Sequence, residues 1–95
     1  MKVYLTAIVH ANNGVSETLK SVLQDMVIHS QKEEACLQYD LFQSTENSET
    51  FIFNEIWVNQ TGLDLHNEMP YIKDFNEKYG NLVNSIKIFK TSKIS

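Results

Sequence analysis

His66 is the side chain in this sequence best suited to moving a proton. It follows Leu63 by three residues and precedes Met69 by three, so on a helix these residues share one inward-facing stripe. A neutral imidazole held there can take a proton from a phenol or an enol near neutral pH. We therefore predict a catalytic role for His66. The alternative is a structural histidine, half-buried and bonded to a backbone carbonyl.

Glu55 and Trp57 lie two residues apart and therefore point to the same side of a predicted strand. A carboxylate is rarely buried without a partner, so Glu55 is either a catalytic group in a polar pocket or a residue at the solvent edge of the sheet. Trp57 and Tyr39 could form the walls of a slot for an aromatic substrate. The alternative is that both are ordinary core residues.

Two further side chains are candidates for substrate binding. Asn54 points to the opposite side of the strand from Glu55 and either donates to a ligand oxygen or pairs across a subunit interface. Tyr71 directly follows Pro70. It either reaches the mouth of the pocket that contains His66 or packs over a break between two helices.

The sequence lacks the motifs of several other kinds of functional site. No two of the three histidines, His10, His29 and His66, have the spacing of metal ligands. The chain also has no glycine-rich phosphate loop, no G-x-S-x-G elbow and no flavin fingerprint. We therefore expect neither a metal ion nor a cofactor.

Composition and charge restrict the partners. The 95 residues predict a single domain spanning 1–95, and a net charge of −4 argues against nucleic acid. The chain has no arginine, the usual bidentate clamp for phosphate groups. The single cysteine, Cys36, is consistent with a reducing compartment, and no apolar stretch is long enough for a membrane span. We expect a cytoplasmic protein that binds no membrane.

Hydrophobic periodicity predicts four strands and two helical regions, the second of them broken in two. Asn12-Asn13-Gly14 should form a turn, and Ser16 should cap the first helix. Pro70 suits the first position of a helix, and Gly80 should stop that helix. The predicted elements are strands at Lys2–His10, Cys36–Gln43, Phe51–Val58 and Val83–Lys90, and helices at Ser16–Lys32, from Asn59 or Thr61 through Glu68, and from Pro70 to Gly80.

This order, β-α-β-β-α-β, is the split βαβ or ferredoxin-like arrangement, an α+β fold with helices on one face of a four-stranded antiparallel sheet. The other face is left uncovered. Because the predicted strands carry apolar residues on both sides, for example Phe53 on one side and Ile52 and Ile56 on the other, a wet second face would forfeit stability. We therefore expect a homodimer in which two sheets cover each other.

Three stretches of this sequence resemble the antibiotic biosynthesis monooxygenase family of dimeric α/β barrels. They are Glu34 to Leu41, Phe51 to Trp57 with its Glu-x-Trp ending, and Leu63, His66, Met69-Pro70-Tyr71 and Phe75. In the family, an acidic residue before a small-residue turn opens the second strand, and a histidine lies in the helix after the third. Ala35 stands here where many members have Pro-Gly.

The resemblance implies a cofactor-independent monooxygenase that acts on a small aromatic quinol-like or anthrone-like substrate. It points to His66 and Glu55 as catalytic residues and to Trp57, Tyr39, Asn54 and Tyr71 as substrate-binding residues. The alternatives are an isomerase of a small signalling metabolite and a non-catalytic stress-response module that binds a hydrophobic ligand. The residues that haem-degrading relatives need are replaced, so haem breakdown is not expected; Ala7, His66 and about Asn76 stand at their places.

Overall fold

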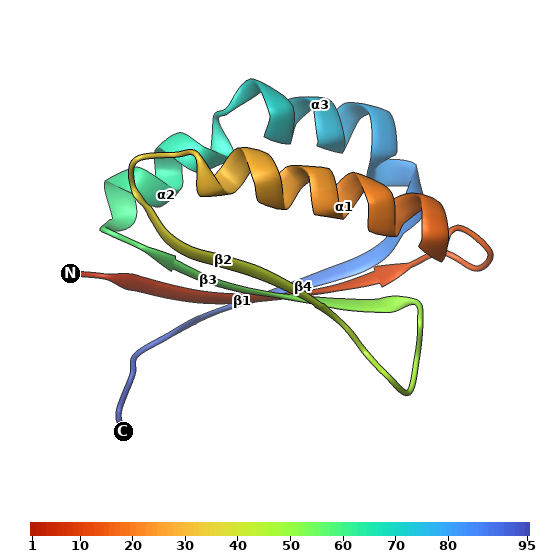
Figure 1. Cartoon of the computed structure of the whole chain (residues 1–95), viewed down its shortest axis with the longest axis horizontal. Coiled ribbons are helices and arrows are strands. Elements are labelled where there is room, and N and C mark those ends of the chain that lie inside the picture. Colours follow the sequence, from red (N-terminus) through yellow and green to blue (C-terminus); the bar gives the residue numbers. More distant parts are fainter.

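The structure is a computed structural model and describes all residues from Met1 to Ser95. Its elements are β1 (Val3–Ala11), α1 (Ser16–Gln31), β2 (Cys36–Gln43), β3 (Thr50–Trp57), α2 (Gln60–Asn67), α3 (Pro70–Tyr79), a 3-10 turn (Gly80–Leu82) and β4 (Val83–Thr91). The four strands form one antiparallel sheet in the order β2-β3-β1-β4 (Figure 1). None of the helices is long and apolar enough to cross a membrane.

The predicted ferredoxin-like order of elements is confirmed, and β2 has the predicted bounds. The prediction that Ser16 caps α1 is wrong. Ser16 is the first helical residue, the cap position is Val15, and no side chain bonds the free amides there. The turn predicted at Asn12-Asn13-Gly14 is present, and Gly14 adopts the left-handed φ of 81° that glycine tolerates. Gly80 does end α3, but with a right-handed φ of −57° that leads into the 3-10 turn.

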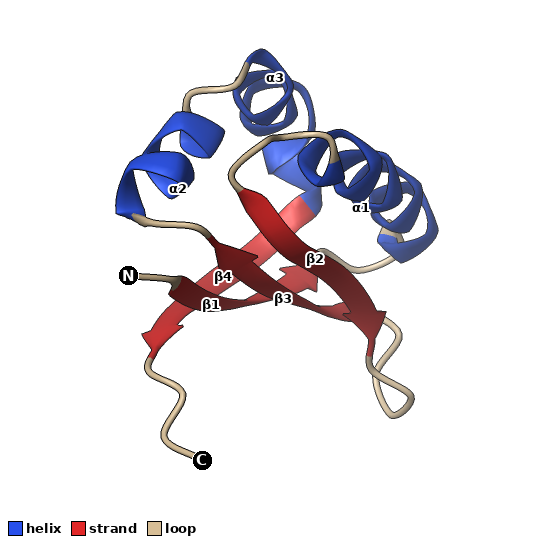
Figure 2. Cartoon of the chain, turned by 60° about the vertical axis from the view of Figure 1, so that its left-hand side comes forward, coloured by secondary structure: helices blue, strands red, loops and turns tan.

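All three helices lie over one face of the sheet, and the other face is open (Figures 1 and 2). The alternation of β1 and β3 decides which side chains meet the helices. From β3 these are Phe51, Phe53, Glu55 and Trp57, all at most 7% exposed. Their neighbours include Leu19 of α1, which is fully buried. Between the two layers lies the core, and one of its members is a glutamate.

The open face of the sheet mixes apolar and polar side chains. Ile8 lies opposite Ile52, and Tyr4 lies opposite Ile56. Between these two pairs the Thr6 hydroxyl donates to the Asn54 side-chain oxygen at 3.1 Å. On the edge strands, Phe42 and Phe89 are about half exposed, at 52% and 49%. This face is therefore less uniformly apolar than the pattern of apolar residues in the predicted strands suggests.

The N-terminus of α2 lies close to the loop between α1 and β2. The Asn59 side chain caps α2 by accepting from the Gly62 amide at 2.8 Å. A Cβ atom added at Gly62 would lie only 2.5 Å from the Cβ of Ala35. Gly62 and Ala35 therefore set how closely α2 approaches the loop.

We expect Gly62→Ala to destabilise the protein by about 1–3 kcal/mol, because an added methyl group in a close contact forces backbone movement. Urea unfolding would measure this loss. Ala35→Gly, introduced together with Gly62→Ala, should recover part of it. Gly80→Ala is the matched control, since nothing lies within 4 Å of a Cβ built there. Equal stability of the Gly62→Ala and Gly80→Ala variants would contradict this account of the contact.

Candidate functional site

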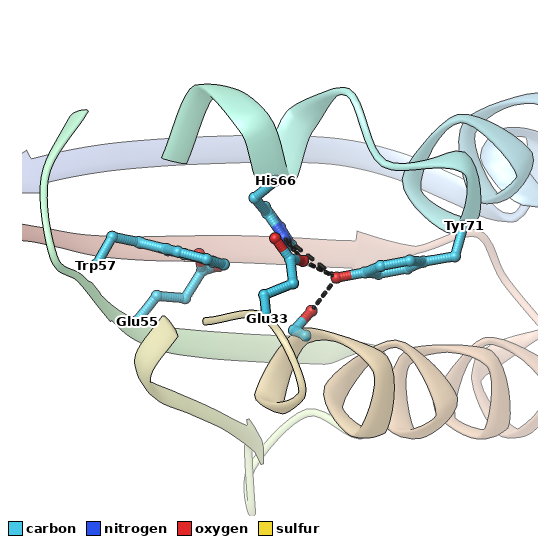
Figure 3. A network of polar contacts seen from close by, with 6 residues as sticks. Glu33, Glu55, Trp57, His66 and Tyr71 are labelled. Atoms are coloured by element: carbon cyan, nitrogen blue, oxygen red, sulfur yellow. Dashed lines mark hydrogen bonds and ion pairs between the residues drawn. The ribbon is translucent and has the colours of Figure 1, made fainter. Parts of the chain in front are cut away.

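His66 lies on the inward side of α2, beside Leu63, and is 4% exposed. Its Nδ1 atom is 2.7 Å from Oε2 of Glu33, which follows the end of α1 (Figure 3). Its partner is therefore a carboxylate and not the backbone carbonyl of the structural alternative. The side chains of His66 and Glu33 are both largely buried, at 5% and 10% exposed, so water screens this contact only weakly.

Tyr71 completes a network around the same carboxylate oxygen. Its hydroxyl donates to Oε2 of Glu33 and lies 3.3 Å from Nδ1 of His66. On its other side the hydroxyl is 3.0 Å from Oγ of Ser30, a fully buried residue of α1. Burial raises the pKa of Tyr71 and its bond to Glu33 raises it further, so the phenol stays protonated and can donate. Four residues from α1, the following loop, α2 and α3 thus meet at one point.

The bond to Glu33 fixes which nitrogen of His66 carries the proton. An ionised carboxylate only accepts hydrogen bonds, so Nδ1 donates and Nε2 keeps its lone pair. Nε2 has no hydrogen bond. No side-chain nitrogen or oxygen in the structure is both fully buried and without a partner, so Nε2 must keep some accessible surface. The arrangement resembles that of a histidine base oriented by an acid.

Aromatic rings surround the imidazole on the side of the sheet. The Trp57 ring lies 4.4 Å from the His66 ring, and the Tyr39 ring lies 5.6 Å from it, measured between centroids. Trp57 and Tyr39 are 0% and 3% exposed. Both rings pack in the buried core beside His66, which is the alternative to their being walls of a substrate slot.

Glu55 faces the interior and not the solvent edge of the sheet. It is 7% exposed, and the indole Nε1 of Trp57 donates to its Oε1 at 2.9 Å (Figure 3). Burial raises the pKa of Glu55 to about 7, the bond from Trp57 opposes this rise, and the charge of Glu33 adds to it. The neutral and ionised forms of Glu55 are therefore both populated near neutral pH.

The structure brings five of the six predicted site residues into one cluster: His66, Glu55, Trp57, Tyr39 and Tyr71. Asn54 is separate from them. It points to the open face, as its position in the strand predicts, and accepts a hydrogen bond from Thr6.

Sequence reasoning missed Glu33 and Ser30. A signal for Glu33 exists, because Glu33 and Glu34 directly follow a helix C-terminus. The helix dipole disfavours negative charge there, so a carboxylate at this place indicates a specific partner. Ser30 carries no such signal; it is one of several polar residues in α1.

The expected cavity lined by His66 is not among five pockets on the surface of the molecule, none of which includes His66. One pocket of about 750 Å³, beside α2, includes Glu33, and another of about 210 Å³, between α1 and α3, includes Tyr71. No group of three or more His, Cys, Asp or Glu side chains is placed to hold a metal ion.

Known proteins resemble this chain in sequence and in fold. The family model described as "Antibiotic biosynthesis monooxygenase" matches residues 3–78. A Bacillus subtilis protein named "Putative monooxygenase YcnE" is 32% identical over 76 residues, which cover 80% of each chain. An uncharacterized Synechocystis protein, sll1783, is 31% identical over 77 residues, covering 78% of this chain and 52% of that longer protein. The crystal structure of PA3566 from Pseudomonas aeruginosa superposes with a TM-score of 0.95 at 29% identity, covering 99% of this chain and 95% of that one.

The raised pKa of Glu55 predicts that the protein loses stability as the pH rises. In the unfolded chain this carboxyl ionises near its usual value of 4.5, but in the folded chain it ionises near 7. Between these values the folded state binds more protons, so the free energy of unfolding falls as pH increases and levels off above about 7.

Glu55→Gln should remove most of this fall, which we expect to amount to a few kcal/mol. The amide oxygen of glutamine can still accept from Trp57. Urea unfolding at pH 5 and pH 8 would compare the two proteins, with Glu46→Gln, at an exposed position, as the control. The raised pKa of Glu55 would be disproved if the difference in free energy of unfolding between the wild-type protein and Glu55→Gln were the same at pH 5 and pH 8.

Proposed function

Because the chain belongs to the antibiotic biosynthesis monooxygenase family, whose model matches residues 3–78, we propose that it is a cofactor-independent monooxygenase. The proposed substrate is a small aromatic molecule of the quinol or anthrone type. The observation that carries the proposal is the His66 imidazole, bonded through Nδ1 to Glu33, with Nε2 free to act as a base. The family match does not favour an isomerase or a binding module.

In the proposed reaction, Nε2 of His66 removes a proton from the substrate and leaves an electron-rich anion. Glu33 stabilises the imidazolium that forms, as the acid does in other acid-histidine pairs. The anion transfers an electron to dioxygen, and recombination forms a carbon-oxygen bond. The resulting peroxide takes back a proton and loses water, so one oxygen atom stays in the product as a carbonyl.

Glu55 is the proposed donor of the proton that the peroxide takes up, and the proton that His66 removed from the substrate returns to Glu55 through water to complete the cycle. A carboxyl group with a pKa near 7 is partly neutral at physiological pH, and a neutral carboxyl can protonate a leaving oxygen. The Trp57 indole orients it through the bond to Oε1. For the substrate ring to lie against His66, the packed rings of Trp57, Tyr39 and Tyr71 would have to separate and hold it between them. Asn54, on the open face, takes no part in this proposal.

We expect His66→Ala to lower oxygen uptake with an electron-rich quinol or anthrone by about 10²-fold or more, since a general base typically contributes that much. An oxygen electrode would measure uptake, and circular dichroism would confirm folding. His10→Gln is the histidine control, because His10 bonds only Thr50 at the other end of β1. Full activity of the His66→Ala protein would remove His66 from the mechanism.

We also propose that the protein works as a homodimer through the open face of its sheet. Ile8, Ile52, Ile56 and Tyr4 form an apolar patch there, and no helix of the chain covers it (Figure 2). A second sheet packed on this patch would remove it from water. The exposed rings of Phe42 and Phe89 on the two edge strands would extend the contact.

The wild-type protein should sediment as a dimer at micromolar concentration, and Ile52→Lys should shift it to a monomer, because a lysine in each copy would be buried at the interface. Analytical ultracentrifugation would measure both. Ile28→Lys is the control, since Ile28 is exposed on α1, on the outer side of the molecule. A stable wild-type monomer would refute the proposed assembly.

A further inference from the structure

We propose that the pocket between α2 and the loop joining α1 to β2 binds a small uncharged or cationic ring compound that carries a hydrogen-bond donor. Glu33 would accept the hydrogen bond from this ligand. This site is separate from the place where the substrate ring would lie against His66, so ligand binding here does not rest on the proposed function. The pocket is not lined by His66 and is distinct in its lining from the core cluster around Trp57.

The pocket has the size and the walls of a small-molecule site. Its volume is about 750 Å³, within the usual range for ligand pockets. Apolar contact is supplied by Ala35 from the loop, Val58 after β3, and Leu65 and Met69 from the α2 region. Val58 and Leu65 are 42% and 62% exposed, so both side chains offer apolar surface to a ligand in this pocket.

Glu33 connects this pocket to the buried network. It is the one residue that both lines the pocket and bonds the side chain of His66. Its Oε2 atom accepts from His66 and from Tyr71, whereas Oε1 has no partner (Figure 3). The side chain is only 10% exposed. Because no fully buried side-chain oxygen lacks a partner, Oε1 must reach accessible space. A nearly buried acceptor with one free oxygen at a pocket wall is suited to a donor on a ligand.

The charges around the pocket select against anions. Glu33, Glu34 and Glu68 line it, and its lining contains no Lys, Arg or His. Lys73 lies 3.2 Å from Glu68 and partly offsets that charge from outside the lining. A phosphate or carboxylate in the pocket would therefore meet like charges and find no cationic partner. A phenol or an amine would find an acceptor and an apolar wall.

The test is a titration of isotope-labelled protein followed through its backbone amide NMR signals. The probes are para-ethylphenol, which is neutral and has a donor, its methyl ether para-ethylanisole, which has no donor, and phenyl phosphate. We expect para-ethylphenol to shift the signals of Ala35, Val58, Leu65 and Met69. Para-ethylanisole should bind more weakly, and phenyl phosphate should bind roughly tenfold more weakly or not at all.

Two variants locate the site. Leu65→Gln should weaken the binding of para-ethylphenol about fivefold, because an exposed polar side chain replaces an apolar wall. Ile28→Gln is the matched control, since Ile28 is also an exposed aliphatic residue on a helix but lines none of the five pockets. A third variant carries Glu34→Gln and Glu68→Gln together. It should bind phenyl phosphate more tightly than the wild-type protein does, so the difference in affinity between para-ethylphenol and phenyl phosphate should become smaller.

The proposal fails if the NMR signals that shift belong to the open face of the sheet. It also fails if they belong to another pocket, which is lined by residues of α1 and β2. It also fails if phenyl phosphate binds as well as para-ethylphenol, if no probe binds, or if Leu65→Gln behaves as Ile28→Gln does. The two proposals fail separately. Binding at Leu65 without oxygen uptake that depends on His66 would keep this site and reject the monooxygenase. Oxygen uptake that depends on His66, with no probe bound at Leu65, would keep the monooxygenase and reject this site.

Discussion

The buried carboxylate of Glu33 organises the helical side of this protein. A carboxylate that is nine-tenths removed from water must be compensated by donors, and His66 and Tyr71 supply them. The same two bonds tie the loop after α1 to both helices that follow β3. The structure thus uses one charge to hold its helical layer together and to set the tautomer of its best candidate base.

Glu55 represents the opposite solution to the same physical problem. It is also buried and also lies among aromatic rings, but its one bond comes from the Trp57 indole, and no cation faces it. Its pKa therefore rises, with burial as the largest cause. The two carboxylates are close enough for the charge of Glu33 to raise the pKa of Glu55, and they differ in the number of donors each receives. That difference gives the site one group suited to stabilising positive charge and one suited to giving up a proton.

The parts of the site that depend on local periodicity could be predicted from the sequence. A two-residue repeat placed Glu55 and Trp57 on one face of β3 and Asn54 on the other, and a helical repeat turned His66 inward. The hydrogen bond between Glu33 and His66 joins residues 33 positions apart, and Glu33 lies in an irregular loop. No sequence repeat encodes such a pairing. The closed state of the cluster was also beyond prediction, because it depends on how tightly Trp57 and Tyr39 pack against the imidazole.

The break at Pro70 has a geometric consequence. His66 and Tyr71 are five residues apart, and in one continuous helix their side chains would diverge by roughly 140° around the axis. Met69 is instead extended, with φ −65° and ψ 141°, so α3 starts in a new direction and returns the Tyr71 phenol to the Glu33 oxygen that His66 also bonds. The interruption at Pro70 is what lets the His66 and Tyr71 side chains of the His-x-x-x-Pro-Tyr segment meet at one oxygen. Deleting or adding one residue between His66 and Pro70 would rotate one of these side chains away from the other.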